Sequence, residues 1–240
     1  MQHTEQRTDL TAALRWAAHL GLHEGVCNHF SFEVGPDRYL INPQGLHWAE
    51  VKVSDILLID GRANVIEGKH EVEPTAFFIH SWVHREHERA KCVLHTHMPY
   101  ATALTLVHGG ELLWCNQNTL RFWDRIAYDN NYGGVALDDD EGRRIASMLG
   151  DKDVMLMASH GVMVAGPSIA WAFDDLYYLE RAAMHQVLAT QASNGRPLRH
   201  IPPGTCAQVA AQIAGERQQS DLHFEAIKRL LDRDQPDWRG

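Results

Sequence analysis

The sequence predicts helices interleaved with a mostly antiparallel sheet, an α/β or α+β sandwich of layers. Two observations favour this fold class. Short apolar segments are bounded by turn-forming residues, and longer segments between them carry apolar residues at helical spacing. The 240 residues suit a single domain over residues 1–240, with a C-terminal helical extension from about residue 194. We therefore expect one sizeable core.

The first elements are a helix and short strands. Apolar residues at helical spacing predict an amphipathic helix over residues 4–20, and Gly21 ends it. Turn-forming clusters such as Gly35-Pro36-Asp37 then separate three segments that predict antiparallel strands: 30–34, 39–41 and 56–59. This part of the chain is therefore expected to be antiparallel.

Helices and strands alternate in the rest of the chain. The pattern predicts the following elements in order: a helix at 75–89, a strand at 92–96, a helix at 99–106, a helix at 138–149, strands at 153–158 and 162–165, a long helix at 168–192 and a last helix at 204–232. Residues 193–203 are linker-like. The helices are expected to pack in layers on the sheet.

Composition narrows the partners. A formal charge of -9 with no basic stripe argues against nucleic acid, and no apolar segment approaches the roughly 20 residues of a membrane span. The N-terminus has no apolar segment behind a basic one, so we expect a cytoplasmic protein. The four cysteines are scattered without a C-x-x-C pair, which predicts buried, reduced thiols. A small molecule is the expected partner.

Histidines at the ends of two apolar segments predict a metal site. Alternate side chains of a strand share a face, so His95 and His97 can hold one ion between them. His160 follows the second apolar segment and can supply a third imidazole while coordination positions stay open for substrate. Among 16 histidines the pair alone could be chance. The third histidine and its glycine-rich surroundings favour the metal site.

Other polar clusters favour structural roles. His80 is expected to face inward, whereas His84 and His87 are expected on a half-solvated helix face. The acidic run that begins at Asp138 is expected to cap a helix, and the charged and aromatic segment 174–181 to take part in packing. Nucleotide-binding glycine motifs and G-x-S-x-G are absent from the sequence.

With these residues in hand, the chain resembles the class II aldolase and adducin-head family over roughly residues 8–195. The matching segments are Asn28-His29-Phe30-Ser31, Ile41-Asn42-Pro43-Gln44-Gly45, Leu94-His95-Thr96-His97 and residues 159–166. The resemblance implies a three-layer α/β/α fold with a central, largely antiparallel sheet, and a homotetramer. It also implies one divalent metal ion per subunit, zinc, manganese or iron, held by His95, His97 and His160.

Departures from the family pattern point away from sugar phosphates. Aldolases that resemble fuculose-phosphate aldolase carry a glutamate base 19 residues before the first histidine of the pair. Here that residue is Ala76, and the neighbouring Glu73 is out of register. The phosphate-holding segments differ as well, becoming Asn28-His29, Asn42-Pro43-Gln44-Gly45 and Pro74-Thr75. The candidate substrate-binding residues are therefore Asn28, His29, Gln44, Gly45 and Thr75.

These departures favour the metal-dependent decarboxylase branch of the family over its aldolases. Retro-aldol cleavage needs a base to remove a hydroxyl proton, whereas decarboxylation does not. We therefore expect a lyase that decarboxylates a hydroxylated carboxylic acid, for which an aromatic acid is one candidate. His29 and Tyr128 are the candidate proton donors. Three alternatives stay open: a retro-aldol lyase or dehydratase with another base, a non-haem iron oxygenase, and a non-catalytic adducin-like module.

Overall fold

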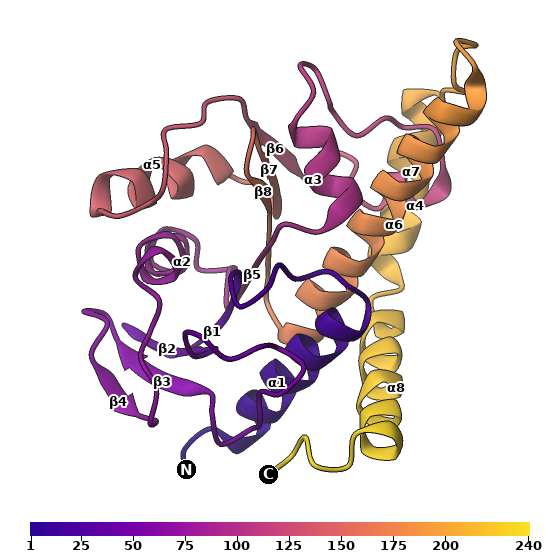
Figure 1. Ribbon diagram of the computed structural model, residues 1–240. Coiled ribbons are helices and arrows are strands. Elements are labelled where there is room, and N and C mark those ends of the chain that lie inside the picture. The colour runs from indigo at the N-terminus through magenta and orange to yellow at the C-terminus, as the bar shows by residue number, and fades with distance from the viewer.

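One eight-stranded sheet runs through the centre of the molecule (Figure 1). The computed structural model describes the whole chain, residues 1–240. The strands are β1 (His29–Gly35), β2 (Arg38–Ile41), β3 (Leu57–Asp60), β4 (Val65–Glu67), β5 (Cys92–Thr96), β6 (Ile126–Asp129), β7 (Val154–Met157) and β8 (Gly161–Gly166). Their order is β4-β3-β2-β1-β5-β8-β7-β6. Only the β6–β7 pair is parallel, so the largely antiparallel sheet is confirmed.

Helices cover both faces of the sheet, which confirms the three layers (Figure 1). One face carries α2 (Pro74–Glu86) and α5 (Asp139–Leu149). The other carries α1 (Thr4–His19), α3 (Pro99–Thr105), α6 (Ile169–Ser193) and α8 (Gln218–Asp234). The short α4 (Gln117–Leu120) and α7 (Pro203–Gly215) lie against each other near α6.

Strand alternation assigns each residue of β5 to one of these two faces. Cys92 and Leu94 belong to the apolar cluster beneath α1 and α6, whereas Val93 belongs to the cluster beneath α2 and α5. Because side chains alternate along a strand, His95 shares the face of Val93. The end of β5 therefore presents its histidine to the layer that contains α2.

Two predictions about helices are corrected. The last helix predicted over 204–232 is two helices, because α7 ends at Gly215 and the chain turns before α8 begins at Gln218. The second helix ends at Glu86, since His87 is already extended, with φ -126° and ψ 92°. The predictions missed β4 and β6, the two edge strands, which are mostly not buried, and α4, which is only four residues long.

Several side-chain predictions are also decided. His84 was expected to be half solvated, which is wrong: it is 3% exposed, because its ring hydrogen-bonds inside the protein. His80 faces inward as predicted, and Asp138 caps α5 by accepting a hydrogen bond from the Glu141 amide at 3.0 Å. The prediction of buried cysteines holds for Cys92 and Cys206, but Cys27 is exposed and Cys115 is only partly buried.

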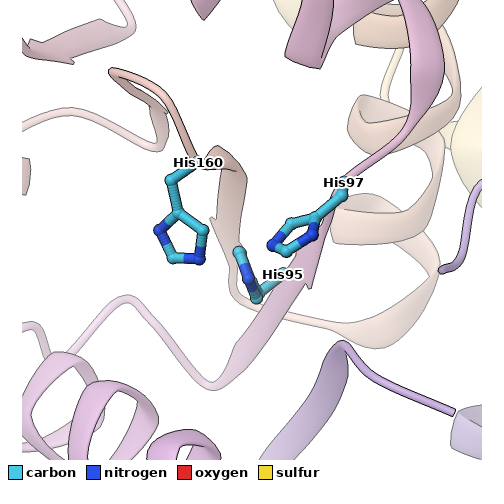
Figure 2. A group of neighbouring side chains, drawn as sticks. All are labelled: His95, His97 and His160. Carbon is cyan, nitrogen blue, oxygen red and sulfur yellow. The ribbon is translucent and has the colours of Figure 1, made fainter. Parts of the chain in front are cut away.

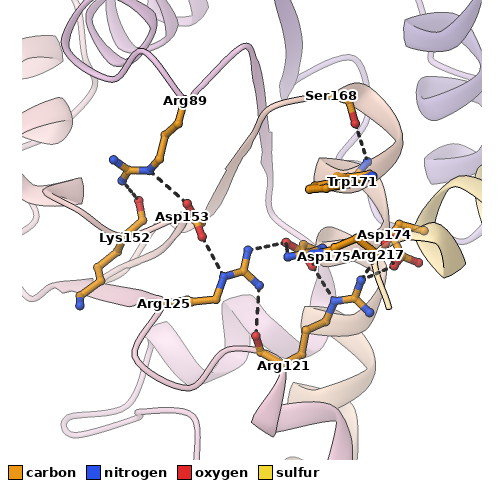
Figure 3. A network of polar contacts seen from close by, with 11 residues as sticks. Arg89, Arg121, Arg125, Lys152, Asp153, Ser168, Trp171, Asp174, Asp175 and Arg217 are labelled. Carbon is orange, nitrogen blue, oxygen red and sulfur yellow. Dashed lines mark hydrogen bonds and ion pairs between the residues drawn. The ribbon is translucent and has the colours of Figure 1, made fainter. Parts of the chain in front are cut away.

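A buried ion-pair network joins α6 to the residue before β6 and to the N-cap residue of α8 (Gln218–Asp234) (Figure 3). Asp175 is 2% exposed and accepts hydrogen bonds from Arg125 at 2.7 Å and from Arg217 at 2.8 Å. Burial opposes ionisation of this carboxyl, but the three arginines around it, Arg121 included, hold its pKa at about 2. The acidic pair at 174–175 thus holds secondary-structure elements together, in agreement with the predicted role of this segment in packing.

None of the helices combines the length and apolar character that crossing a membrane requires.

Candidate metal centre and cleft

Three histidine side chains meet where β5 ends and β8 begins (Figure 2). Each offers one ring nitrogen, and the three nitrogens all lie within 4.8 Å of one another. The ring centroids of His95, His97 and His160 are 4.8 to 5.0 Å apart. Imidazoles on one tetrahedral zinc ion, at about 2.0–2.1 Å from it, have nitrogens about 3.4 Å apart. The donor set therefore fits a divalent ion after small side-chain adjustments.

The chain next to His160 approaches the end of β5 so closely that only a residue without a side chain fits there. Ser159 has a positive φ of 56° and turns the chain between β7 and β8. A Cβ on Gly161 would lie 2.6 Å from both Cδ2 of His97 and the carbonyl oxygen of Thr96. Only glycine lets β8 start this close to the end of β5, and this approach brings His160 to the other two histidines.

Hydrogen bonds to protein acceptors orient two of the three rings. Nδ1 of His95 donates to the carbonyl oxygen of Val162 at 2.9 Å, and Nδ1 of His97 donates to the Glu24 carboxylate. The other nitrogen of each ring then carries the lone pair, and Nε2 of His97 is buried without a partner. Such partners on the far side of a ligating histidine fix its tautomer. A histidine binds a metal through a nitrogen that carries a lone pair, and these hydrogen bonds leave such a nitrogen on each ring.

Burial keeps two of the rings neutral. It lowers the pKa of His95 well below the ordinary range, aided by the repulsion between imidazolium charges that His160 and His97 would add. It also lowers the pKa of His160 to about 4, again with a contribution from His97. A metal binds the deprotonated nitrogen, so no proton must be removed at neutral pH before it binds.

A cleft of about 670 Å³ opens beside the three histidines. All five predicted substrate-binding residues line it: Asn28, His29, Gln44, Gly45 and Thr75. Its apolar side is formed by Val26, Ile79, Tyr132, Val135 and Ala136. None of the 16 lining residues is lysine or arginine, so the protein itself offers no permanent cation to an anionic substrate.

His29 and Glu73 form a pair inside the cleft. His29 lies directly opposite His95 in the β1–β5 register, which puts both rings on the α2 face. Nε2 of His29 is 3.1 Å from a carboxylate oxygen of Glu73. Burial raises the pKa of Glu73, but hydrogen bonds from His29, Thr75 and the Ala76 amide outweigh it and bring the pKa to about 2. The carboxylate is thus ionised, and His29 donates to it.

Glu73 is the residue that sequence reasoning set aside. It is the N-cap of α2 and accepts from the Ala76 amide at 2.8 Å, so its carboxylate reaches back into the cleft. Ala76, which occupies the family glutamate position, is fully buried in an apolar cluster with Tyr39 and Ile41. A carboxylate just before Pro74 at a predicted helix start was the signal that could have found it.

Asn28 and the turn after β2 have separate roles. Asn28 has a φ of 74°, and its side-chain oxygen accepts from the amides of Glu24 at 3.1 Å and His97 at 3.2 Å. It thereby fixes the loop that carries the partner of His97. Gln44 is exposed at the cleft, and Gly45 turns the chain with a φ of 80°.

Tyr128 lies outside this cleft, which corrects its proposal as proton donor. It lines a separate cavity, and its hydroxyl accepts a hydrogen bond from the Leu112 amide at 3.1 Å. Burial raises its pKa to about 12. Tyr132 does line the cleft, with its ring centroid 6.4 Å from that of His160. It stands in an irregular segment where no periodic pattern marks it.

Fold and site together match a known family of metal-dependent enzymes and their relatives. Residues 8–187 match the model of the class II aldolase and adducin N-terminal domain, so the chain belongs to this family and the predicted resemblance is confirmed. A Pseudomonas aeruginosa protein described as a candidate class 2 aldolase is 33% identical over 242 residues, which cover 98% of this chain and 92% of that protein.

Further relatives show how diverse the family is. The crystal structure of an aldolase II superfamily protein from Pseudomonas syringae has a TM-score of 0.91 and 32% identity, and the match covers 100% of this chain and 96% of that one. Decarboxylase NovR of Streptomyces niveus is 28% identical over 201 residues, which cover 80% of this chain and 72% of that protein. The family therefore includes lyases.

Proposed function

We propose that the protein is a divalent-metal-dependent carbon–carbon lyase that decarboxylates a small hydroxylated carboxylic acid. The observation that carries the proposal is a three-histidine centre in the wall of a cleft without lysine or arginine. An anionic substrate in this cleft depends on a metal for its counter-charge. Zinc, manganese and iron all accept imidazole ligands with open positions.

When bound, a divalent ion supplies a Lewis acid for the oxygen beside the scissile carbon. The protein supplies the other parts. The polar turn at Gln44 and Gly45 lies where it can receive a carboxylate, and His29 presents its Nε2 proton, oriented by Glu73. Loss of CO2 leaves an electron pair on the adjacent carbon, and that carbon takes a proton. We propose His29 as its donor.

The apolar side of the cleft supports decarboxylation. The reaction converts a charged carboxylate into neutral CO2, so surroundings that solvate charge poorly favour the product side. Val26, Ile79 and Val135 provide such surroundings in the lining of the cleft. The same side suits a substrate with an aromatic body better than a sugar, whose hydroxyl groups all need hydrogen-bond partners.

Retro-aldol cleavage is a second candidate, and the position of Glu73 is the observation that favours it. The Glu73 carboxylate lines the cleft, although the sequence has alanine at the position of the family glutamate. Its pKa of about 2 makes it a weak base at neutral pH, because a general base works best with a pKa near the working pH. We therefore keep decarboxylation as the main proposal.

Metal analysis of the purified protein tests the centre. We expect His95→Ala, His97→Ala and His160→Ala each to lower metal content and activity together. His200→Ala is the matched control, since His200 is exposed and outside the cleft. Full metal occupancy in all three site variants would remove the metal centre from the proposal.

A screen for CO2 release from hydroxybenzoic and 3-keto acids tests the reaction. Glu73→Gln separates the two lyase candidates, because an aldolase that uses Glu73 as its base should lose aldehyde release almost completely. Decarboxylation by the same variant should be weakened but retained. Oxygen uptake by the iron-loaded protein without CO2 release would instead favour an oxygenase. The homotetramer also stays a prediction, which light scattering on the purified protein checks.

A further inference from the structure

A buried chain of hydrogen bonds lies beneath the cleft, between β1 and α2. The hydroxyl of Ser31 is 2.6 Å from Nδ1 of His80 and 2.7 Å from Nε2 of His84. Nδ1 of His84 is 2.6 Å from the carbonyl oxygen of Ala90. All three side chains are at most 3% exposed. Polar groups are costly to bury, so a connected set in this position calls for an explanation.

The proton positions along the chain follow from its far end. The carbonyl of Ala90 can only accept, so His84 carries a proton on Nδ1. Burial lowers the pKa of His84 to about 4 and that of His80 well below the ordinary range, so both rings are neutral at pH 7. Nε2 of His84 therefore accepts from the Ser31 hydroxyl, which in turn accepts from Nδ1 of His80. Nε2 of His80 is left as a bare acceptor.

The ring of His29 is a neighbour of the His80 ring. Nε2 of His80 and Nδ1 of His29 are both buried without a hydrogen-bond partner, and the two ring centroids lie 5.9 Å apart at 84°. In its neutral form, His29 donates from Nε2 to the ionised Glu73 and carries its lone pair on Nδ1, so that nitrogen is an acceptor too. One water molecule that donates an O–H to each would satisfy these two buried acceptors on neighbouring rings.

We propose that His80 is a positioning residue for His29: the chain through Ser31 and His84 locks His80 in the Nδ1-protonated tautomer, and its Nε2 holds His29 through one bridging water. Glu73 then orients the opposite nitrogen of His29. The ring is held at both ends with its Nε2 proton on the side of the cleft. Partners of this kind behind a functional imidazole fix its tautomer and orientation. The effect on turnover rests on the proposed function, whereas the tautomer does not.

The chain offers a closely matched pair of variants. Ser31→Ala removes the hydroxyl that joins the two histidines. Ser81→Ala removes an equally buried hydroxyl next to His80 that has no partner, and serves as the control. We expect Ser31→Ala to lower kcat for CO2 release about tenfold, in the range found for partners behind functional histidines, with KM and metal content unchanged. Ser81→Ala should keep the wild-type kcat.

Nitrogen NMR of the protein labelled with 15N-histidine reads the tautomer directly, and His80→Gln assigns the signal of His80 by its loss. We expect a pure Nδ1-protonated form in the wild type and a mixture of tautomers in Ser31→Ala. An Nε2-protonated His80 in the wild type would overturn the inference even if no substrate is found. Unchanged kcat in Ser31→Ala would overturn the positioning role while the proposed lyase stands. A wild type that releases neither CO2 nor aldehyde would refute the lyase, and the NMR result would still decide the tautomer.

Discussion

Replacing Gly161 by alanine should disrupt the metal centre through a backbone collision. The new Cβ would meet the His97 ring and the Thr96 carbonyl oxygen at 2.6 Å each, whereas non-bonded carbon atoms pack at about 3.5–4.0 Å. The Thr96 oxygen belongs to the backbone of β5 and cannot swing away. The start of β8 must therefore move by about 1 Å, and this displacement carries His160 with it.

A displacement of about 1 Å is twice the tolerance of about 0.5 Å that a working metal site allows. We expect Gly161→Ala to lower zinc affinity about 10- to 100-fold, the range observed when support behind metal ligands is lost. The overpacking should also reduce the free energy of unfolding by about 1–3 kcal/mol. A competition titration with a chromophoric chelator measures the affinity, and urea unfolding of the metal-free protein measures the stability.

Gly166→Ala is the control at the opposite end of the same strand. Its Cβ would lie 3.2 Å from the Cβ of Ala172, a tight contact far from the histidines. Gly166→Ala adds the same methyl group to β8, and it should retain wild-type zinc affinity. Equal zinc affinity in Gly161→Ala and the wild type would refute the reasoning.

Three further predictions concern other parts of the molecule. Glu24→Gln should lower zinc affinity about 10- to 100-fold by removing the carboxylate behind His97, and an unchanged chelator titration would contradict this. Ala76→Glu should cost about 3 kcal/mol or more in urea unfolding, because the carboxylate enters the apolar cluster around the fully buried Ala76; a midpoint equal to that of the wild type would argue against this placement. The pKa of Asp175 is about 2 in the folded protein, against an ordinary 3.8. The ionised carboxylate therefore stabilises the fold above about pH 4, and this stabilisation is lost as the pH falls from about 4 to about 2. The difference in unfolding free energy between the wild type and Asp175→Asn should therefore shrink by about 2 kcal/mol on acidification from about pH 5 to about pH 2, and acid titration of both proteins would show it.

The sequence by itself determined the layered fold and the three-histidine set. Both rest on local patterns: apolar residues repeat at helical or strand spacing, and His95 and His97 share a strand face by alternation. The position of His160 directly after an apolar strand made its approach to the pair predictable. β4, β6 and α4 showed no such pattern, so these elements appeared only in the structure.

The tertiary structure decided which polar residues meet in the cleft. Counting along the chain selected Ala76 over Glu73, yet the cap of α2 turns the Glu73 carboxylate toward His29 while Ala76 packs in an apolar cluster. Tyr128 was a reasonable proton donor until the fold placed it in another cavity. Cross-strand register and the packing of a helix on a sheet are long-range properties, so no local spacing encodes them. The register and the packing determine which nitrogen of each histidine has a hydrogen-bond partner, and therefore which nitrogen can bind a metal or donate a proton.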